Sequence, residues 1–137
     1  MKTKKQYCEE NGLDIDRVFD MCVSGDEGVL ATRGAFTGYF AEITDTSVIC
    51  TNEKLGIRKE ILFSDFTRAE FGIGNGNLWL QCVVNGKFFA FCTPRKAWKA
   101  PAAKLLMEKI GEKTELLGMK DYERYTGKLF LLWALIK

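Results

Sequence analysis

The chain has 137 residues, of which 47% are apolar and 28% charged, and its net charge is +2. This length fits one domain, and the composition excludes a disordered tail, a low-complexity linker and a collagen-like repeat. The balanced charge excludes a chain that coats nucleic acid, so we expect no nucleic-acid partner. The sequence contains no histidine, which removes imidazole bases, Ser/His and Cys/His pairs and histidine-containing metal sites.

The first element in chain order is an expected helix from Leu13 to Val23. Asp14 is its expected N-cap, and the polar, glycine-containing residues 24–28 end it. The apolar side chains follow the i, i+3, i+4, i+7 spacing of a helix face, at Ile15, Val18, Phe19 and Cys22. We therefore expect residues 1–26 to form an N-terminal helical extension that docks this face onto the rest of the fold.

From Gly28 to Cys92 the pattern changes to short apolar runs separated by turn residues. The expected strands cover residues 28–33, 36–43, 47–51, 57–63, 66–71, 78–84 and 87–92. Seven short strands at this spacing are typical of a meandering sandwich or a small barrel.

Two glycine-containing turns separate the last three strands. Asn85-Gly86 is the strongest hairpin signal in the chain and predicts a type I′ turn. The spacing of Gly72, Gly74 and Gly76 is similar to that of a phosphate-binding loop, which requires a helix after the glycines. The residues that follow, 78–82, are strand-like. We therefore interpret the glycines as the tip of a hairpin.

A helix is expected from Ala100 to Lys113, after Thr93 and Pro94 end the last strand. Pro101 fits the first turn, where a missing N–H costs nothing. One face of this helix is apolar and comprises Trp98, Ala102, Leu105, Leu106 and Ile110. A seven-stranded antiparallel barrel is open at one end, so we expect the helix to close that end, with Trp98 in the core.

Two short motifs lie in the strand region. In residues 43–49, ITDTSVI, an apolar residue and a threonine precede a turn and an apolar strand. In residues 61–67, ILFSDFT, a strand ends in an apolar-x-x-Ser-Asp-apolar step. With these motifs, the chain resembles bacterial pleckstrin-homology-like (PH-like) and GRAM-type domains, although Ser47 stands where these families usually have a basic residue.

The resemblance implies a fold and a class of function. The fold is α+β: a PH-like seven-stranded antiparallel β-barrel capped by a C-terminal helix, over residues 27–112. Residues 1–26 and 118–137 are extensions of this one domain. The resemblance also implies a binding or scaffolding module and not an enzyme.

Basic residues gather where the last strand meets the C-terminal helix. Through Arg68 the chain carries nine basic and twelve acidic residues, a net charge of −3, and the remainder carries eleven and six, a net charge of +5. The candidate anion-binding residues are Arg95, Lys96, Lys99 and Lys104. They could meet anionic lipid headgroups, a phosphorylated ligand or an acidic partner. The alternative is that these side chains bind no ligand and only keep the exposed start of the helix soluble.

The chain ends in eight consecutive apolar residues, Leu129–Ile136, followed by Lys137. This run is shorter than the roughly twenty residues needed to cross a bilayer. We expect it to be buried against the barrel or the N-terminal helix. The alternatives are a contact with a second copy or shallow association with a membrane. The candidate interface residues are Leu129, Phe130, Leu132, Trp133, Leu135 and Ile136.

The cysteines indicate a reducing compartment. Their number is odd, none forms a C-x-x-C pair, and the basic N-terminus is not followed by the apolar region of a signal peptide. They are Cys8, Cys22, Cys50, Cys82 and Cys92. We expect reduced, mostly buried thiols in a cytoplasmic protein, and neither a zinc site nor a nucleophilic cysteine.

The sequence offers no catalytic constellation. Its adjacent carboxylates, such as Glu9-Glu10 and Asp26-Glu27, stand in polar or capping contexts where nothing raises a pKa. We therefore expect no cofactor and no enzymatic activity. The expected function is a non-catalytic binding or scaffolding module that acts through protein–protein contact or self-association. The alternative is peripheral binding to anionic lipid through the basic strand-to-helix junction.

Overall fold

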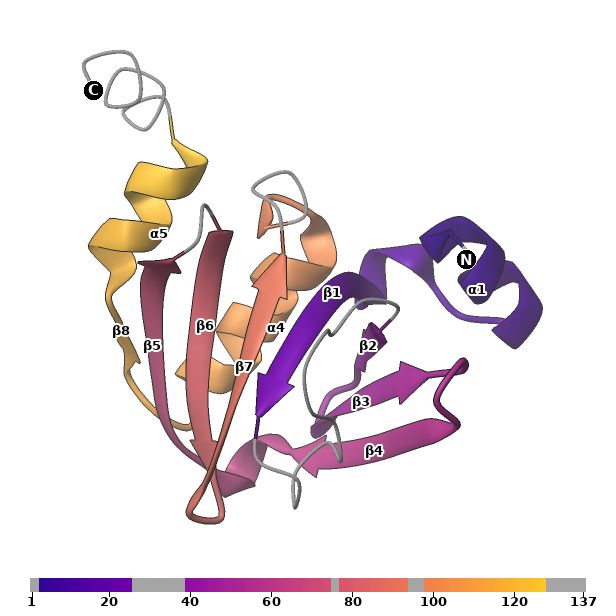
Figure 1. Cartoon of the computed structure of the whole chain (residues 1–137), viewed down its shortest axis with the longest axis horizontal. Helices are drawn as coiled ribbons and strands as arrows, with labels where there is room; N and C mark the ends of the chain where they lie inside the picture. Colours follow the sequence, from indigo (N-terminus) through magenta and orange to yellow (C-terminus); the bar gives the residue numbers. More distant parts are fainter. Residues whose placement is uncertain (1–2, 26–38, 75–76, 94–97, 128–137) are drawn as a thin grey trace.

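Strand β1 (Val18–Gly25) joins two antiparallel sheets in the computed structural model (Figure 1). The structure describes residues 3–25, 39–74, 77–93 and 98–127. The first half of β1 pairs with β2 and the second half pairs with β7. The fold is therefore α+β, with two sheets that share one strand.

Each sheet continues from β1 as a meander. The first sheet has the order β1-β2-β3-β4, and the second has the order β1-β7-β6-β5, with the short strand β8 parallel to β5 at its outer edge. The strands are β2 (Tyr39–Ile43), β3 (Ser47–Asn52), β4 (Ile57–Leu62), β5 (Phe66–Gly74), β6 (Asn77–Val84), β7 (Lys87–Thr93) and β8 (Leu116–Leu117). The predicted strands at 47–51, 57–63, 66–71, 78–84 and 87–92 are thus confirmed as β3 to β7, and the described part of the predicted strand at 36–43 forms β2. The predicted strand at 28–33 lies outside the described residues.

The predicted helix from Leu13 to Val23 is wrong. A helix forms earlier, as α1 (Lys4–Asn11), where Thr3 and Gln6 make a capping box. Asp14 caps only a single 3-10 turn, η1 (Ile15–Arg17), and β1 follows at once. The segment before residue 27 therefore contains a strand as well as a helix.

The error arose because the first two residues of β1 are buried on opposite faces. Phe19 lies in the main core between the sheets, whereas Val18 lies in a smaller core under α1. In this smaller core the ring of Tyr7 stacks on Phe40 with centroids 4.4 Å apart. A strand that is covered on both faces does not alternate between apolar and polar residues, so its spacing can match that of a helix.

The sheets do not close into the predicted seven-stranded barrel within the described ranges. The first sheet ends at β4 and the second at β8, with no strand pairing between these edges. Between β4 and β5 the chain passes through the 3-10 turn η2 (Phe63–Asp65). A backbone hydrogen bond of 3.4 Å from Asn85 N to Asp65 O links this turn to the β6–β7 hairpin. The arrangement is therefore two sheets joined on one side and open on the other.

The predicted helix near residues 100–113 is confirmed as α4 (Pro101–Gly111), with Pro101 in its first turn. Its buried face comprises Ala102, Ala103, Leu106, Met107 and Ile110, which pack into the main core. The predicted hairpin turn is also confirmed, since Asn85 and Gly86 both have positive φ values, 52° and 75°.

Trp98 is fully buried in the main core, as predicted. Its ring lies 5.0 Å from that of Phe19 and 5.5 Å from that of Phe71. Its Nε1 donates a hydrogen bond of 3.1 Å to the carbonyl oxygen of Leu78. Trp98 therefore ties the start of α4 to both sheets.

Helix α5 (Met119–Thr126) follows β8 and packs beside β5 (Figure 1). Gly118 precedes it with φ 70°, and a Cβ at this position would collide with the carbonyl oxygen of Phe71. Tyr122 of α5 donates a hydrogen bond of 3.3 Å to the carbonyl oxygen of Trp98. None of the helices in the described ranges is long and apolar enough to cross a bilayer.

Candidate functional site

The structure places only some of the predicted site residues. Lys99 and Lys104 are exposed at the N-terminal end of α4. Arg95 and Lys96 lie outside the described residues, as does the whole apolar tail with Leu129, Phe130, Leu132, Trp133, Leu135 and Ile136. Trp98, which stands next to Lys99, is buried and cannot act as a membrane anchor in this structure.

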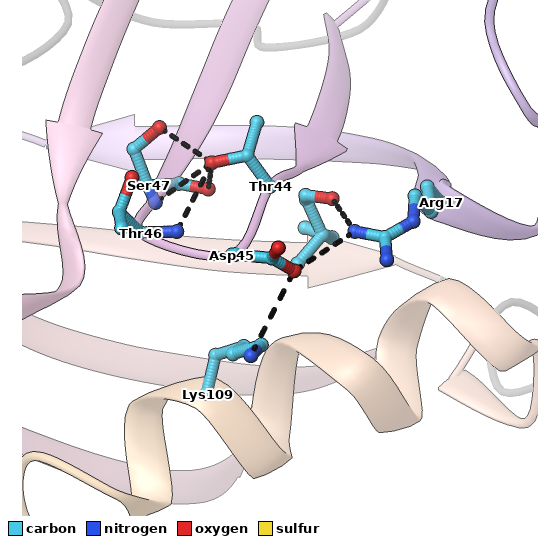
Figure 2. Close-up of polar contacts among 7 residues, drawn as sticks. Arg17, Thr44, Asp45, Thr46, Ser47 and Lys109 are labelled. Atoms are coloured by element: carbon cyan, nitrogen blue, oxygen red, sulfur yellow. Dashed lines mark hydrogen bonds and ion pairs between the residues drawn. The ribbon is translucent and has the colours of Figure 1, made fainter.

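A different group of polar residues comes together at the C-terminal end of α4 (Figure 2). Its centre is the β2–β3 turn, where the hydroxyl oxygen of Thr44 accepts hydrogen bonds from Ser47 N at 2.9 Å and Thr46 N at 3.3 Å. The Ser47 hydroxyl, fully buried, donates to a carboxylate oxygen of Glu60 on β4 at 2.7 Å. These bonds hold the turn in one conformation.

Asp45, at the tip of this turn, lies between two cations. Arg17 Nη1 donates to the carbonyl oxygen of Ile43 at 3.1 Å and lies 3.6 Å from Asp45 Oδ1. Lys109 Nζ of α4 lies 4.0 Å from the same oxygen. The Asp45 side chain is 80% exposed, so these ion pairs orient the groups and add little stability.

The turn, the end of β4, η2 and the end of α4 border a shallow cleft of about 150 Å³. We call this the turn–helix surface, and it comprises Asp45, Thr46, Leu62, Phe63, Ser64, Lys109, Glu112 and Lys113. Leu62 is 45% exposed there, although it continues the strand that buries Ile61. An apolar side chain is thus exposed to solvent and surrounded by acidic and basic groups.

A second cleft, of about 170 Å³, lies on the open side of the two sheets, between β4 and the β6–β7 hairpin. We call it the seam cleft, and it is lined by Lys59, Glu60, Ile61, Asp65, Val84, Asn85 and Lys87. Lys59 lies two residues from the buried Ile61 and so shares the inward face of β4. A lysine at this position in an edge strand opposes pairing with a further strand. This cleft therefore has the features of a protected sheet edge.

Burial makes the thiols of Cys50 and Cys82 unreactive. Burial raises the pKa of the Cys50 thiol to about 12, and burial, with a smaller effect of Cys50, raises the pKa of Cys82 well above its usual value. Cys8, Cys50, Cys82 and Cys92 are all buried, as the sequence predicted for most of the cysteines. Within the described ranges, no group of three or more potential ligands could hold a metal ion.

The turn–helix surface was missed by sequence reasoning, because its residues come from three separate parts of the chain. The local signal for one part was visible, since residues 44–47 form the turn of the ITDTSVI motif. Nothing in the sequence showed that α4 would bring Lys109 to that turn. Comparison of the sequence with protein-family models and with curated proteins gives no match.

Proposed function

We propose that this protein is a non-catalytic binding module that contacts a protein partner, another chain or a second copy of itself, through the turn–helix surface. The observation that carries the proposal is the exposure of Leu62 within a rim of charged groups. Protein interfaces combine an apolar centre with a polar rim of this kind.

The surface is also held rigid before any partner binds. The β2–β3 turn is held by the Thr44 and Ser47 hydrogen bonds, and Lys109 is placed by α4, whose apolar face is anchored in the main core. A rigid surface loses little conformational entropy on binding. Burying the exposed part of Leu62 would contribute about 1 kcal/mol, and Lys109 and Lys113 could meet acidic groups of the partner.

The strand order is consistent with the resemblance to PH-like domains, and this resemblance supports a binding role. Two meandering antiparallel sheets share β1, and a helix with one apolar face follows the last strand of the meander. We propose that the chain is a PH-like domain with an open rather than closed sheet arrangement. A fold supports many functions, so this likeness supports the binding role and does not specify the partner.

The test is site-specific photo-crosslinking in cells, with a photoreactive amino acid in place of Leu62. Leu55 is the matched control, because it is a leucine of the same hairpin, 54% exposed, in the turn at the other end of β4. We expect position 62 to give a discrete protein adduct and position 55 to give none. No adduct from position 62, or the same adducts from both positions, would contradict the proposal.

Binding to anionic lipid is the second candidate, favoured by the exposure of both Lys99 and Lys104 at one end of α4. A lysine near an anionic membrane contributes about 1 kcal/mol. The double variant Lys99→Glu/Lys104→Glu should therefore weaken binding to phosphatidylserine vesicles at low salt by about tenfold or more. Lys54→Glu/Lys120→Glu, which changes two exposed lysines elsewhere, is the charge-matched control. Equal binding by all three proteins would exclude this candidate.

A further inference from the structure

The two walls of the turn–helix surface carry opposite net charges. One wall, which we call the turn wall, consists of the β2–β3 turn, the end of β4 and η2, and its charged residue in the cleft is Asp45. The other, the helix wall, consists of the end of α4 and carries Lys109, Glu112 and Lys113. One acid on the turn wall gives a net charge of −1, and two bases with one acid on the helix wall give +1.

The charged groups on both walls remain open to a partner. The side chain of Asp45 is 80% exposed, although Arg17 and Lys109 lie within 4.0 Å of its carboxylate. Lys113 is exposed and forms no ion pair with any residue that the structure describes. Leu62, which lines the same cleft, is 45% exposed. The surface therefore offers an acid on one wall, a base on the other and an apolar side chain.

Two copies of such a surface complement each other. A two-fold axis that lies along the cleft brings the turn wall of one copy against the helix wall of the other, and the same contact forms twice. The opposite net charges of the walls then face each other, which favours association. A strongly acidic or strongly basic partner would instead be attracted by one wall and repelled by the other. The charge pattern thus favours a second copy of this chain.

We propose that the turn–helix surface binds a second copy of the chain in a symmetric dimer. Asp45 of each copy pairs with Lys113 of the other copy, and the contact covers both Leu62 side chains. The inference rests on the proposed function, because it names the partner of the same surface. Eight residues line the cleft, fewer than the roughly 20 to 30 on each side of a stable interface, so the dimer is weak and forms as the concentration rises.

The test is sedimentation equilibrium of the full chain, at concentrations from about 5 µM to about 1 mM. We expect a reversible equilibrium between monomer and dimer. Leu62→Glu should raise the dimer dissociation constant by about tenfold or more, because it brings two carboxylates into the contact. Leu55→Glu is the matched control, since Leu55 is 54% exposed at the other end of β4, and it should leave the constant unchanged. A chain that stays monomeric throughout, or equal effects of the two variants, would overturn the proposal.

An exchange of charges tests the pairing itself. Asp45→Lys and Lys113→Asp should each weaken the dimer by about fivefold or more, because the symmetry repeats each lost pair and brings like charges together. The double variant restores opposite charges across the contact and should bring the dissociation constant to within about threefold of the wild-type value. The proposal is wrong if the single variants dimerise as well as the wild type, or if the double variant dimerises no better than they do.

Failure of this inference can be told apart from failure of the proposed function. A crosslink from position 62 to a different protein, together with a purified chain that stays monomeric, would overturn the inference and leave the proposed function standing. No crosslink from position 62, together with a dimer that Leu62→Glu does not weaken, would overturn both.

Discussion

The two ends of helix α4 carry similar charges but have different surroundings. At the N-terminal end, Lys99 and Lys104 point into solvent beside the buried Trp98. At the C-terminal end, Lys109 lies 4.0 Å from Asp45 of the β2–β3 turn (Figure 2). The exposed Leu62 lines the same cleft. The first end supports the core and presents lysines singly, whereas at the second end several elements build one surface. Local sequence signals therefore located the helix but not the surface that other elements complete.

The largest expected effect concerns the N-terminal end of α4. Trp98→Ala should lower the free energy of unfolding by about 3 to 5 kcal/mol, because the ring packs between Phe19 and Phe71. Urea unfolding measures this loss. Trp79→Ala is the control, since Trp79 is only partly buried and bonds to Gly74. Equal losses for the two variants would mean that Trp98 does not anchor the helix.

A smaller loss is expected in the turn that faces the C-terminal end. Thr44→Val removes the hydroxyl that accepts hydrogen bonds from Ser47 N and Thr46 N. We expect the free energy of unfolding to fall by about 1 to 2 kcal/mol and crosslinking from position 62 to weaken. Thr46→Val, in the same turn but at an exposed position, should leave the free energy of unfolding unchanged. If Thr44→Val leaves the stability unchanged, the hydrogen bonds do not hold the turn.

The link between α5 and the N-terminal end of α4 has a pH dependence. Tyr122→Phe removes the hydrogen bond to the Trp98 carbonyl and should cost about 1 kcal/mol at neutral pH. Burial raises the pKa of Tyr122 above its ordinary value of 10.0, so the folded chain holds this proton more tightly than the unfolded chain.

Its contribution to stability is therefore complete below pH 10 and is lost as the pH rises through the folded-state pKa. Urea unfolding across the alkaline range should show the wild type losing stability more steeply than Tyr122→Phe. Parallel curves for the two proteins would contradict this assignment.

The smallest expected effect is that of the ion pairs at the C-terminal end. Asp45→Asn removes the partner of both Arg17 and Lys109. Because Asp45 is 80% exposed, the free energy of unfolding should change by no more than about 0.5 kcal/mol. Thermal unfolding at low and high salt measures this. A loss above about 1 kcal/mol would mean that these ion pairs support the fold rather than orient the surface.

What the sequence predicted correctly depended on local signals. Asn85-Gly86 specifies its own turn geometry, and Pro101 with the following apolar stripe specifies α4. The prediction for β1 failed because its first two residues are buried on opposite faces, Phe19 in the main core and Val18 in the small core under α1, and local spacing does not show this. The sequence did not predict the turn–helix surface either, because this surface also depends on the tertiary arrangement. Only that arrangement leaves Leu62 exposed and brings Lys109 to Asp45.

Crosslinking from the two ends of α4 tests the central claim most directly. A photoreactive amino acid replaces Lys113 at the C-terminal end in one protein and Lys104 at the N-terminal end in another, both of them exposed lysines. The account predicts that position 113 gives the same protein adduct as position 62 and that position 104 gives none. An adduct from position 104 with none from position 113 would contradict it.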